Sequence, residues 1–253
     1  MASRSNALVS NASAVHEAEV FKRLIKAQAT CTGKIVFTTS FGLEDQVLTS
    51  FIAQSGLGAT IVLATLDTGR LFPEVYDLWA QTEERYGVVI RGYAPKADDL
   101  EGLIHDQGIN GFRASPEARK RCCGVRKLLP LERALHGASG WLTGLRADQS
   151  RARAETPFMQ HDAKRNLLKI SPLYDWSREQ ALDFARGHDV PLNPLHERGF
   201  VSIGCAPCTR AIAPGEPERA GRWWWEQDAA KECGLHVGSD GRLIRAAKAQ
   251  AAS

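Results

Sequence analysis

Four of the six cysteines in this 253-residue chain occur in two close pairs. Cys122 and Cys123 are adjacent in "RKRCCGVRK", whereas Cys205 and Cys208 form the C-x-x-C of "GCAPCT". The two thiolates of a C-x-x-C can bind a common metal centre. Structural disulfides are not expected, because a cytosolic compartment keeps thiols reduced. The two pairs therefore indicate a shared metal or iron–sulfur site.

Basic residues surround the first pair. The stretch 113–133 holds seven Lys or Arg against two Glu, although the formal net charge of the whole chain is only +3. Such a run has two interpretations: a solvated helix face, or a site for a small anionic ligand. The net charge of the chain is too small to indicate nucleic acid as a partner.

The composition is that of a globular protein, with 43% hydrophobic and 24% charged residues. No apolar run approaches the roughly 20 residues that span a bilayer. The first residues, "MASRSNALVSNAS", lack the apolar region of a signal peptide. We therefore expect a cytoplasmic protein with no membrane partner. Because this start is rich in Ser and poor in acids, an organelle transit peptide is the alternative.

Apolar β-branched segments alternate with helical patterns over the first two thirds of the chain, which predicts β-α units and a mostly parallel sheet. The fold class expected is therefore α/β, with helices flanking the sheet. Strands are predicted at 34–38, 59–66, 87–91, 140–145 and 167–170. Helices are predicted at 12–30, 43–55, 73–86, 98–106, 122–136 and 177–187.

Two predicted strands end in similar polar turns, in "FTTSFGLEDQVL" (37–48) and "LATLDTGRLFPEVYDLW" (63–79). Ligands of open α/β sheets bind at the carboxyl ends of strands, and a turn at a helix N-terminus offers N–H groups to an anion. Two such turns at one sheet edge would make a crevice of nucleotide size. The competing interpretation is that these polar residues only shape the turns.

A third strand end, in "WLTGLRADQSRAR" (141–153), supplies a glycine and several arginines. Gly144 allows close backbone approach, and the planar guanidinium group matches tetrahedral oxyanions. The arginines Arg146, Arg151 and Arg153 therefore favour phosphate or sulfate. Segment 214–226 adds Arg219 and Arg222.

The sequence pattern divides the chain into two parts. Residues 1–200 are predicted to form a nucleotide-binding α/β domain, with residues 1–14 disordered. From about residue 195 turns, Pro, Gly and three consecutive Trp replace the periodic patterns. We expect the C-terminal segment, 201–253, to be irregular, to fold over the domain and to move.

The motifs taken together resemble a known family, the assimilatory adenylyl-sulfate/phosphoadenylyl-sulfate reductases, and more closely its bacterial iron–sulfur adenylyl-sulfate reductases. The resemblance runs from about residue 30 to residue 236. It implies a sheet like that of adenine-nucleotide α-hydrolases, with a modified phosphate loop at 39–45. In chain order, the motifs that carry it are "TTSFGLEDQVL", "LDTGRLFPE", "KRCCGVRK", "GLRADQS", "GCAPCTRAI", "RAGRWWWE" and "KECGLH".

The resemblance implies a substrate with a phosphosulfate anhydride, adenylyl sulfate, reduced to sulfite and AMP in sulfate assimilation and cysteine biosynthesis. By position in the motifs, the nucleotide would be held by Thr39, Ser40, Phe41, Leu66, Thr68 and Gly144. The phosphosulfate would be surrounded by Lys127, Arg153, Arg219 and Arg222.

Cys233, in "KECGLH", matches the nucleophile of the family. The resemblance implies that its thiolate attacks the sulfate sulfur and becomes an S-sulfocysteine, which an external thiol reduces. Lys231 and His236 are close enough in sequence to lower its pKa. No thioredoxin-like sequence follows residue 236, so a separate thioredoxin or glutaredoxin is the expected partner. The sequence leaves open whether the chain forms a homo-oligomer.

The resemblance also implies that Cys122, Cys123, Cys205 and Cys208 bind a [4Fe–4S] cluster. Neighbouring helical residues lie about 100° apart, so adjacent cysteines suit separate corners of a cluster better than one small ion. The predicted helix N-terminus and the flanking basic residues would stabilise the thiolates. A zinc site with the same four ligands is the alternative.

Other functions remain open on the residues alone. Within the family that the chain resembles, the cysteine quartet implies adenylyl sulfate as substrate, because enzymes for its 3′-phosphorylated form, phosphoadenylyl sulfate, usually lack it; that form is the nearest alternative substrate. A metal-binding nucleotide protein without catalysis is a further alternative. An ATP pyrophosphatase-type enzyme such as a tRNA thiolase is disfavoured, because "TTSFGLED" replaces the usual Ser-Gly-Gly-x-Asp-Ser loop.

Overall fold

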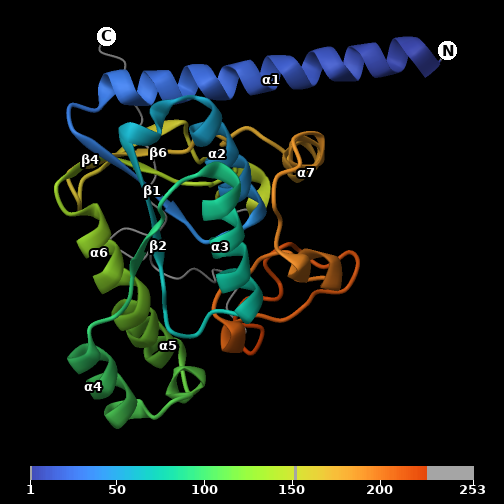
Figure 1. Ribbon diagram of the computed structural model, residues 1–253. Helices are drawn as coiled ribbons and strands as arrows, with labels where there is room; N and C mark the ends of the chain where they lie inside the picture. The colour runs from blue at the N-terminus through green and yellow to red at the C-terminus, as the bar shows by residue number, and fades with distance from the viewer. Residues whose placement is uncertain (1, 151–152, 227–253) are drawn as a thin grey trace, which may run out of the picture.

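In this computed structural model the described residues are 2–150 and 153–226, with side chains described from Ala14 onward. A six-stranded sheet with the order β3-β2-β1-β4-β6-β5 forms the centre of the fold (Figure 1). Neighbouring strands are parallel except for β5, which runs antiparallel to β6. The strands are β1 (Lys34–Thr39), β2 (Ile61–Leu66), β3 (Arg91–Tyr93), β4 (Ala138–Leu142), β5 (Met159–Asp162) and β6 (Leu167–Ile170).

Helices cover both faces of the sheet, as the alternation of side chains along β1 requires. Ile35 and Phe37 pack into a core shared with α1, α2, α3 and α7. Val36 points to the opposite face and packs with Leu131 of α6. The helices are α1 (Ala2–Thr30), α2 (Leu43–Gln54), α3 (Pro73–Tyr86), α4 (Ala97–Gln107), α5 (Pro116–Cys123), α6 (Leu129–Leu135) and α7 (Arg178–Gly187).

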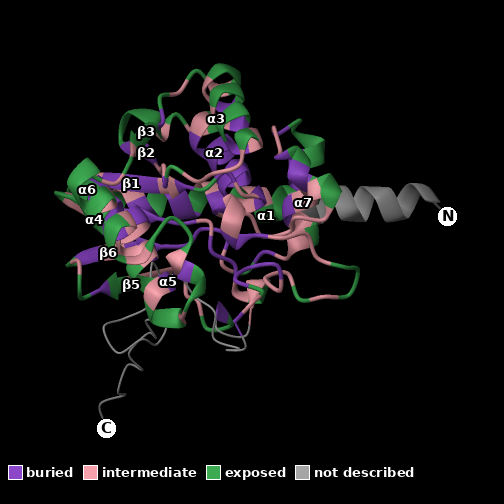
Figure 2. Cartoon of the chain, turned by 90° about the horizontal axis from the view of Figure 1, so that it is seen from below, coloured by how far each residue is buried: buried purple, intermediate pink, exposed green. Residues whose placement is uncertain are grey.

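Burial follows this layered arrangement. In Figure 2, β1 and α2 are largely buried, whereas exposed residues gather on the outer surfaces of α3, α4 and α6. Short 3-10 turns occupy Leu57–Ala59, Gly111–Arg113, Ala147–Gln149, Pro194–Arg198 and Ala206–Cys208. Among the described residues, no helix combines the length and the apolar character needed to cross a membrane.

The α/β fold class is confirmed, with differences at particular elements. Strand β5 was not predicted, and β3 begins at Arg91, where the predicted strand 87–91 ends. Helix α1 begins at Ala2, ten residues before the start predicted at residue 12. Ser and Asn, which are frequent at this start, weaken the helical signal because they hydrogen-bond to nearby backbone.

The predicted helix 122–136 is in fact three pieces. Ser115 caps α5 by accepting a hydrogen bond from the Ala118 N–H, and Pro116 occupies its first turn. A π-helical turn over Gly124–Leu128 then leads into α6. Pro130 has no N–H to give to the carbonyl four residues earlier, which accounts for the local loss of the α-helical pattern. The π turn carries Arg126 and Lys127, and such turns often occur at functional sites.

Candidate active site and cysteine site

A cavity opens at the carboxyl ends of β1, β2 and β4, where the sequence placed a nucleotide crevice. All ten residues predicted to contact substrate line it, although they come from five separate segments of the chain. They are Thr39, Ser40, Phe41, Leu66, Thr68, Lys127, Gly144, Arg153, Arg219 and Arg222.

The loop after β1 is held by hydrogen bonds to a buried carboxylate. The backbone N–H and the hydroxyl of Ser40 donate to Asp45 Oδ2 at 2.6 and 2.8 Å. Burial raises the pKa of Asp45 to about 6, although the hydrogen bonds from Ser40 oppose the rise. Phe41 adopts a positive φ of 59°, and its buried ring stacks on Trp79. The loop is thus shaped before any ligand arrives.

Gly144 is required by this loop. A Cβ at Gly144 would lie 2.3 Å from Asp45 Oδ1 and 3.2 Å from the Asp45 backbone nitrogen. The close approach predicted for Gly144 is therefore to the neighbouring loop. A glycine at this strand end brings two of the strand-end turns together at one edge of the sheet.

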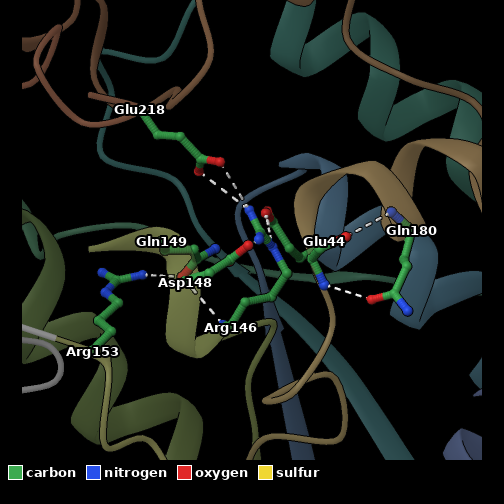
Figure 3. Close-up of polar contacts among 8 residues, drawn as sticks. Glu44, Arg146, Asp148, Gln149, Arg153, Gln180 and Glu218 are labelled. Atoms are coloured by element: carbon green, nitrogen blue, oxygen red, sulfur yellow. Dashed lines mark hydrogen bonds and ion pairs between the residues drawn. The ribbon is translucent and has the colours of Figure 1, made fainter. Parts of the chain in front are cut away.

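Arg146 does not take the role that its sequence suggested. It is fully buried, and its Nε donates to Glu44 Oε1 at 2.7 Å. Its other two nitrogens donate to Asp148 and Glu218, as Figure 3 shows. The prediction that Arg146 binds phosphate or sulfate is therefore wrong, because carboxylates already occupy its guanidinium group. Arg151 lies outside the described residues.

Sequence reasoning missed Glu44 and Glu218, both of which line the cavity. Arg146 outweighs the burial of Glu44, so that the pKa of Glu44 is lowered. Burial raises the pKa of Glu218, and Arg146 only partly opposes the rise. The signal available in the sequence was Arg146, directly after the strand predicted at 140–145. An arginine that is buried at such a place needs a carboxylate as counter-charge.

Four cationic side chains give the cavity its positive wall. Lys127 comes from the π turn, Arg153 from the turn after β4, and Arg219 and Arg222 from the C-terminal segment. Arg222 is 6% exposed and donates from Nη1 to the Ile203 carbonyl at 3.2 Å. Arg153 donates to Gln149 Oε1 at 2.5 Å. The wall suits an anion with several oxygens.

The four paired cysteines line a second cavity beside the first. Cys123, Cys205 and Cys208 are buried in a small hydrophobic cluster with Phe112 and Trp223. The described cysteines form no disulfides with one another. Lys127, Arg222 and Trp223 line both cavities, so the two sites share a wall.

The electrostatics of these thiols depend on the shared wall. Burial alone would raise the pKa of Cys205, but Lys127, the Thr68 hydroxyl and Arg222 more than offset it, and the pKa is lowered. Burial raises the pKa of Cys208 to about 11, and the neighbouring Cys205 adds to the rise. Within residues 2–150 and 153–226, no group of three or more His, Cys, Asp or Glu is arranged to hold one metal ion.

One predicted source of thiolate stabilisation is absent. Cys122 and Cys123 lie at the C-terminal end of α5, and not at a helix N-terminus as predicted. The helix continues from α5 through the π turn into α6, so the two cysteines lie within it, away from the N-terminal N–H groups that would favour a thiolate. Burial raises the pKa of Cys122, and the positive charge that partly opposes this rise comes from Arg126.

The turn after β2 connects the two cavities. Thr68 Oγ1 lies 3.2 Å from Cys205 Sγ in a buried hydrogen bond. Arg126 Nη1 donates to the Thr68 carbonyl at 2.6 Å, and the Ala206 N–H donates to the Arg70 carbonyl at 2.8 Å. The sequence placed Thr68 at the nucleotide only, whereas the structure places it at the boundary of both sites.

Trp223 separates the cavities. It is 1% exposed, and the guanidinium groups of Arg119 and Arg222 lie 4.4 and 4.9 Å from its ring centroid. Its φ of 44° is unusual for a bulky residue. Arg119 in turn donates to Glu226 at 2.5 Å, and both side chains are buried. The sequence signal was the triple Trp beside arginine, whose function was not predicted.

The predicted nucleophile, Cys233, lies outside the described residues, as do Lys231 and His236. The described part of the C-terminal segment, 201–226, is irregular, as expected. This part lines the first cavity with Val201 to Gly204, Glu218, Arg219, Arg222 and Trp223.

Comparison with known proteins agrees with this geometry. Residues 34–211 match the family described as the phosphoadenosine phosphosulfate reductase domain. A protein of Agrobacterium fabrum named adenosine 5'-phosphosulfate reductase is 57% identical over 205 residues, which cover 81% of this chain and 78% of that protein. A protein of the same name from Allochromatium vinosum is 54% identical over 202 residues, covering 80% and 78% of the two chains.

Solved structures show the same architecture. A phosphoadenylyl-sulfate reductase from Candida auris, crystallised with phosphate, superposes with a TM-score of 0.64 at 25% identity, covering 76% of this chain and 90% of the other. The Candida glabrata FMN adenylyltransferase in complex with ATP shares the fold alone, with a TM-score of 0.54 at 16% identity and coverage of 82% and 68%. With its matched span, its similar relatives and its strand-end cavity, the chain belongs to the phosphoadenosine phosphosulfate reductase domain family.

Proposed function

We propose that this protein reduces adenylyl sulfate to sulfite and AMP with electrons from a thioredoxin. One observation carries the proposal: the cavity lined by all ten predicted substrate residues shares Lys127 and Arg222 with the cavity of the four cysteines. Relatives at 54–57% identity are named adenosine 5'-phosphosulfate reductase. The enzyme class is thus an oxidoreductase that acts on a sulfur group.

The charges of the cavity support binding of the anhydride end of this substrate. Lys127, Arg153, Arg219 and Arg222 line one continuous cavity, and guanidinium forks bind phosphate and sulfate oxygens strongly. The turns after β1 and β2 would hold the nucleoside, with Thr39, Ser40 and Thr68 as polar contacts. Binding of this kind positions the sulfate sulfur for attack.

The chemistry needs a nucleophile and two electrons. In the proposed step the Cys233 thiolate forms an S–S bond to the sulfate sulfur while the S–O bond to the phosphate breaks, so that AMP leaves with the bridging oxygen. One thiolate of thioredoxin then attacks Cys233 Sγ and releases sulfite. Its second thiol resolves the mixed disulfide, which returns Cys233 as a thiol and leaves thioredoxin oxidised. A glutaredoxin with the same dithiol chemistry is the alternative donor.

The cysteine cavity fits a [4Fe–4S] cluster by its donor set. Four thiols surround one buried cavity, and Arg126, Lys127 and Arg222 offset the negative charge that thiolate ligands bring. In this proposal Cys122, Cys123, Cys205 and Cys208 hold the cluster, which supplies structure and electrostatics next to the substrate. Lys127 and Arg222, which line both cavities, would then stand between the cluster and the substrate.

Steady-state turnover of the purified protein with thioredoxin tests the proposal. Sulfite release from adenylyl sulfate is expected, with a strong preference over phosphoadenylyl sulfate, and Cys233→Ser is expected to abolish it. The matched control Cys31→Ser, remote from both cavities, should keep full activity. A preference for the 3′-phosphorylated nucleotide would replace the substrate assignment. Unchanged sulfite release in Cys233→Ser would reject the catalytic role of Cys233. No sulfite release by the unsubstituted protein would favour a metal-binding nucleotide protein without catalysis.

A further inference from the structure

A fully buried arginine joins the first strand-end loop to the C-terminal segment beside the cavity. Arg146 is 0% exposed and binds Glu44 at the start of α2 and Glu218 of segment 214–226 (Figure 3). We propose that Arg146 and Glu218 are positioning residues, whose ion pair holds the adjacent Arg219 at the cavity. The inference rests on the proposed function, because Arg219 is taken as a substrate-binding group.

Arg146 itself has no surface left for substrate. Its Nε, Nη1 and Nη2 each donate to a different carboxylate, those of Glu44, Asp148 and Glu218. Three carboxylates around one guanidinium group leave the cluster with net negative charge, which would repel an anhydride of phosphate and sulfate. Arg146 can therefore act on the substrate only through the residues that it holds.

Glu218 links Arg146 to the cationic wall, because Arg219 follows it directly in the chain. Its two oxygens accept hydrogen bonds from Arg146 Nη2 at 3.2 and 3.3 Å. Two tight turns follow at once, because the Ala220 N–H donates to the Pro217 carbonyl and the Arg222 N–H donates to the Arg219 carbonyl. Because these turns fix the backbone from Pro217 to Arg222, the position of Arg219 depends on the position of Glu218. Without the ion pair, Arg219 would lose its fixed distance from the rest of the wall.

The same turn supports a second cation of the wall. Gln149 Oε1 accepts the backbone N–H of Arg146 at 3.3 Å and Arg153 Nη1 at 2.5 Å. Figure 3 shows Arg153 reaching Gln149 from the side opposite Glu44. The turn that begins at Arg146 therefore sets the position of Arg153 as well. Two of the four cations thus depend on a residue that does not touch the substrate.

A double-mutant cycle tests the proposal on the full-length holoenzyme. The variants are Glu218→Gln, Arg219→Ala and the combination of both. The matched control is Glu216→Gln, which breaks the Arg210–Glu216 pair of the same segment outside the cavity wall. The readouts are kcat and KM for adenylyl sulfate, and amide hydrogen exchange of a peptide covering residues 214–226.

Loss of one charge-assisted pair should lower kcat/KM about tenfold in Glu218→Gln, mainly through KM. In the Arg219→Ala background the same substitution should cost less than about twofold, because coupled residues are not additive. Glu216→Gln should stay close to the unsubstituted protein. Exchange should be faster in Glu218→Gln, which shows that the segment has loosened.

Two results would overturn the proposal. Additive losses in the double variant would mean that Glu218 acts without Arg219, for example by touching substrate itself. Unchanged kinetics and exchange in Glu218→Gln would mean that the ion pair does not hold the segment. If the unsubstituted protein fails to turn over adenylyl sulfate, the proposed function is rejected, whereas hydrogen exchange still decides whether Arg146 and Glu218 hold the segment.

Discussion

Thr68 Oγ1 lies 3.2 Å from Cys205 Sγ, and this buried hydrogen bond joins the proposed nucleotide turn to the cysteine cavity. Thr68 follows β2, and Cys205 is 137 residues further along the chain. The contact makes one side chain part of both sites. Substitutions at the cysteines should therefore affect substrate binding, and substitutions in the turn should affect the cysteine site.

Thr68→Val keeps the shape of the side chain but removes this hydrogen bond. We expect a loss of about 1–2 kcal/mol in the free energy of unfolding, because a buried sulfur is left without its partner. The cysteine site should also lose bound iron faster during dialysis against a chelator. Urea unfolding and iron analysis measure the two effects.

Thr143→Val is the control for this prediction. The Thr143 hydroxyl is also buried at the cavity, but it lies 3.0 Å from the Ser171 hydroxyl and not beside a cysteine. It should lose comparable stability and keep iron as the unsubstituted protein does. Equal iron loss from both variants would contradict a specific link between Thr68 and Cys205.

Gly144→Ala should destabilise the fold and weaken substrate binding. The new methyl group would meet Asp45 Oδ1 at 2.3 Å, so the loop after β1 must shift. Overpacking of this kind costs about 1–3 kcal/mol. Gly102→Ala in α4, where a Cβ meets open space, should instead stabilise by about 0.5–1 kcal/mol. Thermal unfolding of both variants measures the contrast, and equal melting temperatures would contradict the steric argument.

Asp45 should make the protein less stable at neutral pH than at mildly acidic pH. Its pKa is about 6 in the folded protein, above its ordinary value of 3.8, so folding favours the protonated form. This stabilisation is fully present below the unfolded pKa and is lost as pH rises through about 6. A pKa raised from 3.8 to about 6 corresponds to roughly 3 kcal/mol in the free energy of unfolding.

Urea unfolding at pH 4 to 8 of the unsubstituted protein and of Asp45→Asn tests this effect. The difference between the two pH profiles should change mainly between pH 4 and pH 6, because the amide does not titrate. Parallel profiles across this range would show that Asp45 titrates normally in the folded protein.

Arg146→Met should cost about 3–5 kcal/mol of stability, because it leaves Glu44, Asp148 and Glu218 close together without their cation. Arg186→Met removes an exposed pair with Asp183 and should cost less than about 1 kcal/mol. Chemical denaturation of both variants gives the comparison. Similar losses would show that the carboxylates around Arg146 are solvated well enough to need no partner.

Cys122→Ser should remove iron and sulfide together, because a four-iron cluster loses a corner ligand. Anaerobic purification, visible absorption and metal analysis of this variant and of Cys31→Ser measure the effect. Cys31 packs against the core formed with α1 and α2, so its substitution should leave the iron content unchanged. If the unsubstituted protein is colourless and contains zinc, the cluster is rejected and the alternative of a zinc site is favoured.

Much of the framework was predictable because its signals are local. Strands β1, β2 and β6 and helices α2, α3 and α7 begin within about two residues of their predicted starts, since apolar periodicity and capping residues act over short stretches. Strand β5 was missed because its four residues, of which only Asp162 is buried, carry no apolar alternation. The break at Gly124–Leu128 was missed because the basic run has a helical composition throughout.

The sequence by itself determined which residue types stand at the strand ends and in the cysteine pairs, because those motifs are contiguous. Only the tertiary structure decided what each charge does. Arg146 and Arg153 are neighbours of similar chemistry in one motif, yet Arg146 is bound by carboxylates from distant segments while Arg153 lines the cavity. The physical reason is that the role of a charge depends on burial and on its counter-charges, and the fold brings those from far along the chain.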